Sequence, residues 1–456
     1  MAPPTKKGVS SVRACLTGIQ LEHKQVARGV LTVGAFVLLA KLIAMVKEMA
    51  VAWRYGTDPI VDAYLFVFNL IQYPANIWSG VIGVVLVPFA IRLRHIAPHD
   101  LATFRAELLG ASIITAGVLG VVAWLVIPWL VQQPWIGLAV EQVALAIAIV
   151  APAAAILAVS VLSAVWAAWT MAGNRHINTL LEATPALMIL LGVLVLGGPN
   201  TLMWATLVGF VLQAVLLLLG VKARGDVELP SFVLSSPHWH SFLSGLGVLL
   251  LSQSLIGALG LVDHLFAARL GVGAISSLGY ADRVLSLILT LGATTVGRAL
   301  LPVLSRAHMQ SKNGIGQIAF QWAFILGSIG LAVAIVGISL APTGVEVLFQ
   351  RGRFTAEDTR QVAEVLRYSL VRVPFYFTSL VLVYALFSQG RQRVVAVVTA
   401  LGVMVKFLLA LVLVPVLGLG GLVLATAGVY LTTSASYAWL LHMDDASLNR
   451  RPSSDR

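Results

Sequence analysis

The sequence predicts an all-α membrane protein of about twelve transmembrane helices, in two six-helix bundles related by a parallel internal repeat. The 456 residues are 59% hydrophobic and 11% charged, whereas soluble domains carry about 25% charged residues. Long apolar segments recur from Gly29 to Leu441, and roughly 20 apolar residues suffice to span the hydrocarbon of a bilayer. Short motifs also recur between the two halves. Water is therefore not the solvent around most of this chain.

Short polar or basic loops separate the apolar segments and define the expected helices. These cover residues 30–53, 63–91, 108–131, 143–171, 180–197, 202–221, 242–268, 276–304, 318–341, 362–387, 394–417 and 421–442. The polar stretch in the middle contains two prolines and two histidines, which favours a linker between bundles. The expected organisation is an N-terminal segment (1–28), a first bundle (29–221), a linker (222–241), a second bundle (242–442) and a tail (443–456).

The loop charges predict the orientation of the chain, because Lys and Arg are enriched in cytoplasmic loops. With a cytoplasmic N-terminus, the outside loops hold only Arg54, Arg269, Arg351, Arg353 and Arg360. The inside loops hold Arg92, Arg94, Arg105, Arg175, Lys222, Arg224, Arg306, Lys312, Arg391 and Arg393. This bias, with an even number of helices, places both termini in the cytoplasm. The net charge of +11 is then a topology signal rather than a nucleic-acid site.

The repeat is indicated by matching motifs in the two halves. Arg54-Tyr55-Gly56 is echoed by Arg269-Leu270-Gly271, and Val87-Pro88 by Leu301-Pro302 at nearly the same offset. Six helices separate the copies, so both start with the same orientation, as in the parallel repeats of some transporters. Chance similarity among apolar segments is the alternative.

Ionisable residues inside the predicted helices are the candidate functional groups, because each costs at least about 2.5 kcal/mol at the bilayer centre. We expect Lys41, Lys47, Arg283 and Arg298 to bind substrate, and a second set to support binding or coupling: Glu48, Asp62, Asp263, Asp282 and Lys406. With Arg367 and Arg372, interior cations outnumber anions. Lys47 and its neighbour Glu48 point about 100° apart on a helix, so we do not expect them to neutralise each other. This excess predicts a cationic cavity for an anionic, phosphate-bearing passenger.

Structural alternatives apply to several of these residues. Arg298, Arg367 and Lys406 could extend to an interface. Asp62 begins an apolar segment and could act only as a helix cap, and Asp263 could pair structurally with a cation.

The remaining features limit the class of protein. The single cysteine, Cys15, allows no disulfide within the chain, and no cofactor or metal site is indicated. A P-loop is absent, so membrane potential or an ion gradient is the expected energy source. A membrane glycosyltransferase would need a larger loop or paired carboxylates, and a drug or cation antiporter would favour an acidic cavity. The sequence therefore favours transport of an anionic lipid-linked substrate, with the oligomeric state left open.

Several motifs resemble the MurJ/MviN family of lipid II flippases, part of the multidrug/oligosaccharidyl-lipid/polysaccharide exporter superfamily. In the first half these are Lys41, Lys47-Glu48, Tyr55-Gly56, Asp62-Ala63-Tyr64 and Leu86-Val87-Pro88. In the second half they are Ser252-Gln253, Gly271, Tyr280-Ala281-Asp282-Arg283, Leu301-Pro302 and the run from Leu348 to Thr355.

The resemblance implies transfer of an undecaprenyl-pyrophosphate-linked sugar from the cytoplasmic to the outer face of a bacterial inner membrane. Cavity arginines of the family fall on Lys41, Lys47 and Arg283, and an early aspartate falls on Asp62. The departures are a second helix without the family's arginine and glutamate, Lys406 where some members hold sodium with Asp or Asn, and twelve rather than the common fourteen helices. They leave open lipid II itself or an exopolysaccharide repeat unit as the substrate.

Overall fold

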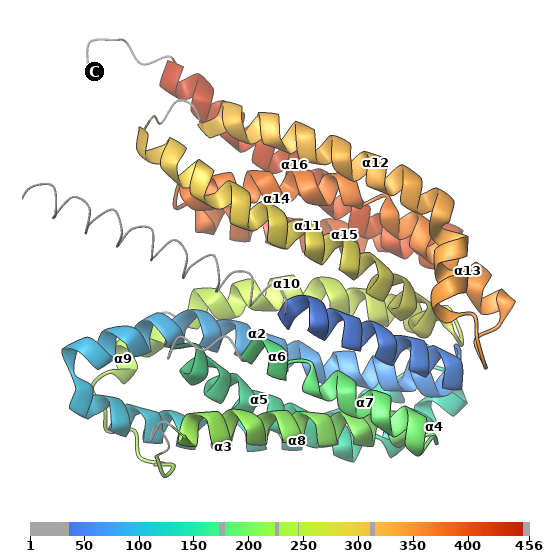
Figure 1. Ribbon diagram of the computed structural model, residues 1–456, viewed down its shortest axis with the longest axis horizontal. Helices are drawn as coiled ribbons and strands as arrows, with labels where there is room; N and C mark the ends of the chain where they lie inside the picture. Colours follow the sequence, from blue (N-terminus) through green and yellow to red (C-terminus); the bar gives the residue numbers. More distant parts are fainter. Residues whose placement is uncertain (1–35, 173–177, 224–227, 245, 311–314, 450–456) are drawn as a thin grey trace, which may run out of the picture.

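The computed structural model describes residues 36–172, 178–223, 228–244, 246–310 and 315–449, and within these the regular structure is helical (Figure 1). The helix that occupies residues 36–55 comes first. The others are α2 (Pro59–Ile96), α3 (Pro98–Val131), α4 (Val140–Ala148), α5 (Val150–Ala172), α6 (Asn178–Leu181), α7 (Thr184–Val195), α8 (Thr201–Lys222), α9 (Trp239–Ser244), α10 (Leu246–Ala268), α11 (Ala274–Gln310), α12 (Ile315–Phe349), α13 (Ala356–Leu370), α14 (Val373–Ser388), α15 (Gln392–Leu417) and α16 (Leu419–Asn449).

The helices confirm the all-α membrane prediction. Ten described stretches are long and apolar enough to cross a bilayer. The helix at 36–55 and the shorter α7 occupy the two remaining predicted segments. Each of the twelve predicted segments therefore coincides with helical structure. Residues 1–28 lie outside the described part of the chain, as does the end of the predicted tail.

Within the described residues, three of the predicted helices are each divided in two, and proline explains each break. Helices α4, α6 and α13 end at Ala148, Leu181 and Leu370, each four residues before a proline: Pro152, Pro185 and Pro374. A proline ring clashes with the carbonyl four residues earlier and provides no N–H to bond it. The chain therefore restarts as a new helix at each of these points.

Helix packing follows the same pattern in the two halves. In the first, α5 packs against α2, α3 and α8, and α7 packs against α8. In the second, α14 packs against α11, α12 and α16, and α15 packs against α16. The parallel repeat requires equivalent pairs of this kind, and the repeat itself stays a prediction.

Helix α10 packs against both halves. It lies along α2 and also contacts α15. Tyr73 of α2 donates a hydrogen bond to the carbonyl of Ser254 in α10 at 3.1 Å. Although the sequence assigns α10 to the second bundle, this helix therefore connects the two.

The two halves meet tightly at one end of the molecule, which we call the joined end: residues 53–62, 271–280 and 350–358. There the Tyr280 hydroxyl donates to the carbonyl of Gly56 at 2.9 Å, and the Arg353 N–H donates to the carbonyl of Trp53 at 2.9 Å. Gly56 has φ +59°, and a Cβ there would lie 2.7 Å from the carbonyl oxygen of Arg353. In Figure 1, α11 and α12 diverge from α2 and α10 away from this end.

The described part of the predicted linker is fixed to the first half. The buried Glu107 of α3 accepts hydrogen bonds from the Ser235 and Ser236 backbones at 3.0 Å and from Trp239 Nε1 at 2.6 Å. Relative movement of the halves about residues 228–239 would therefore have to break this anchor. Sequence reasoning missed Glu107 because it lies at the polar edge of an apolar segment, where a solvated carboxylate is ordinary.

Candidate binding site in the first bundle

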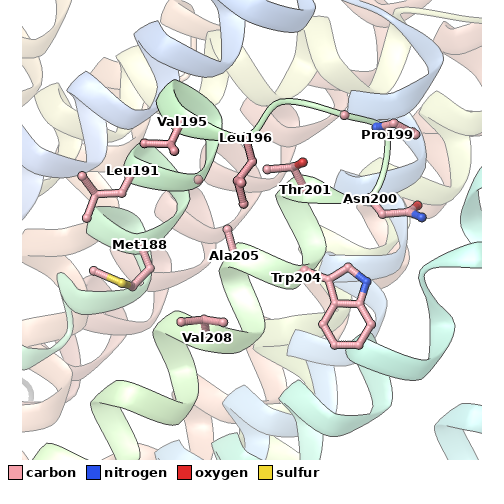
Figure 2. Close-up of a pocket in the computed structure, with 12 residues that line it drawn as sticks. Met188, Leu191, Val195, Leu196, Pro199, Asn200, Thr201, Trp204, Ala205 and Val208 are labelled. Carbon is pink, nitrogen blue, oxygen red and sulfur yellow. The ribbon is translucent and has the colours of Figure 1, made fainter.

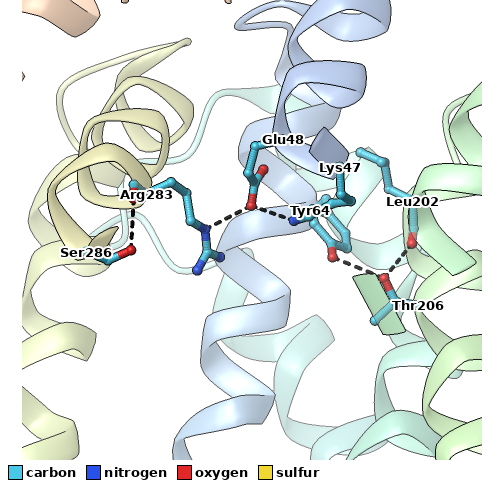
Figure 3. Close-up of polar contacts among 7 residues, drawn as sticks. All are labelled: Lys47, Glu48, Tyr64, Leu202, Thr206, Arg283 and Ser286. Carbon is cyan, nitrogen blue, oxygen red and sulfur yellow. Dashed lines mark hydrogen bonds and ion pairs between the residues drawn. The ribbon is translucent and has the colours of Figure 1, made fainter. Parts of the chain in front are cut away.

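The first helix and α11 bring three charged residues together between the two halves (Figure 3). Glu48 Oε1 accepts from Lys47 Nζ at 2.5 Å and from Arg283 Nε at 2.9 Å. Lys47 and Glu48 are buried, whereas the Arg283 side chain is 45% exposed. One carboxylate thus holds two cations, and the group keeps a net positive charge.

The expectation that Lys47 and Glu48 would not neutralise each other is wrong. Their backbone positions do diverge around the helix, but both side chains are long and converge on one oxygen. Burial favours this, since an isolated charge in a low-dielectric region is costly. Excess positive charge remains because Arg283 reaches the same oxygen from the other half.

A cavity of about 340 Å³ lies beside this cluster, and Lys47, Glu48 and Arg283 all line it. Helices α2, α7 and α8 form much of the remaining wall. Tyr64 contributes a ring, and its hydroxyl lies 3.0 Å from Thr206 Oγ1. In the described contacts, the terminal guanidinium nitrogens of Arg283 bond to no protein group, so they are available to a ligand. A guanidinium presents a planar fork that matches phosphate oxygens.

A second cavity of about 250 Å³ continues from the first. The two share Glu182, Phe210 and Gln213, and the second extends along α2 and α5 past Gln72 and Asn76. Its wall is mostly amide, hydroxyl and small apolar groups. The charged cluster therefore opens into a longer, polar space within the first bundle.

Two predicted binding residues are not part of the central cluster. Lys41 lies nearly two turns before Lys47, is partly exposed, and interacts electrostatically with Glu182. It therefore influences the cavity from its rim. Arg298 belongs to α11, but its side chain lies outside the described part of the chain.

Asp62 has a different structural role from the one its position suggested. It does not cap its own helix, because Asp58 does so by accepting from the Ile60 N–H at 3.0 Å. Instead the fully buried Asp62 accepts from the N–H groups of Gly273 and Ser276 at 2.6 and 2.7 Å, and from Gln142 Nε2 at 2.8 Å. It thereby caps α11 of the other half and ties the joined end together.

Four other interior charges of the second half form two separate pairs, whereas Arg367 is exposed and donates to the carbonyl of Ile338 at 3.3 Å. Lys406, almost fully buried, donates to Asp263 Oδ2 at 2.6 Å and to the carbonyl of Leu259 at 2.5 Å. Arg372 donates to Asp282 Oδ1 at 2.8 Å. Asp263 therefore pairs with a cation, as the structural alternative in the sequence analysis proposed. Two cations counted toward the excess, Lys406 and Arg372, are therefore compensated by carboxylates and are not available to a ligand.

A groove of another character, with a mostly apolar wall, lies on the first bundle (Figure 2). Helices α7 and α8 form it, with a volume of about 650 Å³ and a lining that includes Leu191, Val195 and Trp204. These side chains are exposed, as expected of a surface facing acyl chains. Without a charged residue in its lining, the groove does not suit a phosphate headgroup. Among the described residues there is also no cluster of three His, Cys, Asp or Glu that could hold a metal.

Comparison with known proteins identifies the family. Residues 51–448 match the family described as "Lipid II flippase MurJ". A probable lipid II flippase MurJ of Bdellovibrio bacteriovorus is 32% identical over 225 residues, covering 49% of this chain and 43% of the relative. The lipid II flippase MurJ of Burkholderia cenocepacia is 25% identical over 358 residues, covering 74% of this chain and 69% of the relative.

Solved structures show the same fold. A lipid II flippase MurJ in an inward closed conformation matches with a TM-score of 0.78 at 15% identity, covering 91% of this chain and 89% of that one. An inward-facing multidrug transporter of the MATE family matches with a TM-score of 0.71 at 17% identity, covering 93% and 100%. At these identities the two matches establish the architecture alone.

Proposed function

This chain belongs to the MurJ family of lipid II flippases, and on that premise we propose that it moves lipid II, or a related undecaprenyl-pyrophosphate-linked glycan, across the membrane. The direction is from the cytoplasmic to the outer face, for peptidoglycan or cell-surface polysaccharide synthesis. The observation that carries the proposal is the cluster in which one carboxylate, Glu48, holds both Lys47 and Arg283 beside a cavity. A pyrophosphate supplies the negative charge that this cluster lacks.

Binding replaces one partner by another. The terminal nitrogens of Arg283 form charge-assisted hydrogen bonds to phosphate oxygens, while Glu48 keeps hold of Nε. Lys47 is drawn from Glu48 toward the phosphate, so the free energy of breaking one ion pair is offset by forming another. Glu48 thus keeps both cations in place when the substrate is absent.

The contacts at the joined end support alternating access. The loop charges predict that this end lies outside, and in that orientation the arrangement described here is closed outward and diverges toward the cytoplasm. Opening outward would break the bonds of Asp62 to Gly273 and Ser276. The protein would lie in a bacterial inner membrane with cytoplasmic termini, and membrane potential or an ion gradient would drive the cycle.

The test is complementation in bacteria depleted of their own flippase, with the outer-face exposure of lipid II measured in spheroplasts. Arg283→Ala should lower translocation by about ten- to a hundredfold, the usual value of hydrogen bonds to a charged group. Arg360→Gln is the matched control, because Arg360 is highly exposed and bonds to Glu357. Normal growth with Arg283→Ala at wild-type protein level would overturn the site. Wild-type chain that restores growth only in an exopolysaccharide export mutant would point to the other glycan.

A further inference from the structure

The second cavity of the first bundle differs in chemistry from the charged cluster that it adjoins. Gln72 and Asn76 of α2 and Gln213 of α8 supply amides, and Ser163 of α5 supplies a hydroxyl. None of its lining residues is Lys or Arg, and Glu182 is the acidic one. A wall of this kind repels phosphate and offers hydrogen bonds to neutral polar groups.

Most polar side chains of this wall make no hydrogen bond within the described protein. In the described structure, the three amide side chains take part in no hydrogen bond. Ser163 is 7% exposed, and its Oγ has no partner. Ser160 also lines the cavity, but its Oγ bonds to the carbonyl of Ile156 at 2.7 Å. Buried hydroxyls usually find a partner, so an unpartnered one in a cavity wall indicates a ligand.

Aromatic rings adjoin the amides. Phe210 lines both cavities and lies 6.4 Å from Phe68, which stacks on Tyr64 at 5.6 Å. Amides and hydroxyls beside an apolar ring face suit a sugar ring, which has hydroxyls around its edge and C–H groups on its faces. An acyl chain would leave the amides unpaired, at a cost of about 1–3 kcal/mol for each buried group.

We propose that this cavity is a glycan subsite, in which the first sugar of the lipid-linked substrate binds while its pyrophosphate binds Lys47 and Arg283. The inference rests on the proposed function and adds a second point of recognition to it. Gln213 and Glu182, which line both cavities, stand where pyrophosphate and sugar join. The subsite recognises the sugar, and the charged cluster binds the pyrophosphate that all such lipids share.

The experiment measures binding of two lipids to the purified full-length chain: undecaprenyl pyrophosphate, and the same lipid carrying its sugars. Asn76→Leu and Gln72→Leu, which alter the second cavity and not the first, should each weaken binding of the glycosylated lipid by about tenfold, as expected for the loss of one or two hydrogen bonds. Binding of bare undecaprenyl pyrophosphate should not change. Thr170→Val removes a hydroxyl of α5 that bonds to the carbonyl of Trp166 and does not line the cavity, so it should affect neither lipid.

Three other outcomes are distinguishable. If Asn76→Leu and Gln72→Leu bind both lipids like the wild type while Arg283→Ala weakens both, the subsite is wrong and the charged site stands. If the two leucine variants weaken both lipids equally, the cavity recognises no sugar, and the inference is again wrong. If the wild type binds neither lipid, the proposed function fails and the subsite with it. Unfolding temperatures close to wild type establish that the variants are folded.

Discussion

Two buried carboxylates of this protein differ in how many charges they hold. Glu48 in the first helix holds two cations beside a cavity, and one of them, Arg283, is half exposed. Asp263 in α10 holds one cation, Lys406, and both are almost sealed from solvent. The first arrangement leaves a net positive charge for a ligand, whereas the second is a complete ion pair with no net charge, in which Asp263 Oδ1 has no hydrogen-bond partner. Stoichiometry and exposure, rather than the number of buried cations, therefore separate a binding site from a structural tie.

The largest expected effect breaks the complete pair. Lys406→Ala leaves the Asp263 carboxylate buried and uncompensated, which costs about 3–5 kcal/mol of folding free energy. Lys47→Ala should cost much less, because Glu48 keeps Arg283 as a partner. The two variants are compared by their midpoints of thermal unfolding in detergent and by the yield of folded protein.

A double substitution is the control for this prediction. Asp263→Leu combined with Lys406→Leu removes both charges and should recover most of the lost stability, since apolar replacement of a buried ion pair is often neutral. If the pair is only a tie, transport by this double variant should survive. Transport lost at full stability would instead make Asp263 and Lys406 a coupling site, and equal destabilisation by Lys406→Ala and Lys47→Ala would contradict the comparison.

Asp62 sharpens the comparison, because its three described hydrogen-bond partners are all neutral donors. Asp62→Ala leaves the N–H groups of Gly273 and Ser276 without an acceptor, and each buried unpaired group costs about 1–3 kcal/mol. The joined end should therefore open more often. The measurement is thiol labelling of a cysteine introduced by Ser277→Cys, a position buried in the closed form, in a chain whose native Cys15 is replaced by serine. Labelling should be faster when Asp62→Ala is added.

Thr355 provides the matched control for that experiment. In the described contacts its hydroxyl bonds only within α13, where it accepts from the Asp358 N–H at 3.2 Å, so Thr355→Ala should cost about 1 kcal/mol without increasing labelling at position 277. Equal labelling rates in the two variants would mean that Asp62 does not hold the two halves together.

The sequence predicts the helices well but not the partners of their charges. Hydropathy alone locates all twelve apolar segments, since each is long and bounded by polar loops. The prolines at 152 and 374 were visible, yet a break four residues earlier is not obvious when the apolar run continues through it. Pairing of Asp263 with Lys406 could not be read, because the two residues come together only when α10 packs against α15.

Within the site, the sequence found the groups but not their geometry. Lys47, Glu48 and Arg283 were selected because charge is expensive in a membrane, and the structure brings them together. Angular separation on a helix misjudged Lys47 and Glu48, since it describes where side chains start and not where long ones end. The polar cavity was missed because Gln72, Asn76 and Gln213 are uncharged and scattered over two helices, with no motif to join them.

The smallest expected effect concerns a carboxylate that is neither buried nor near a cavity. Glu357 accepts from Arg360 at 2.7 Å, one turn later on α13, and both side chains are largely exposed. Water solvates such charges about as well as they solvate each other, so Glu357→Gln should shift neither the unfolding midpoint nor transport measurably. Raising the salt concentration, which screens this exposed pair, should likewise leave the unfolding midpoint of the wild type unchanged. A clear loss of stability in Glu357→Gln would show that exposure does not separate these pairs, and the contrast between Glu48 and Asp263 would then need a cause other than burial and charge count.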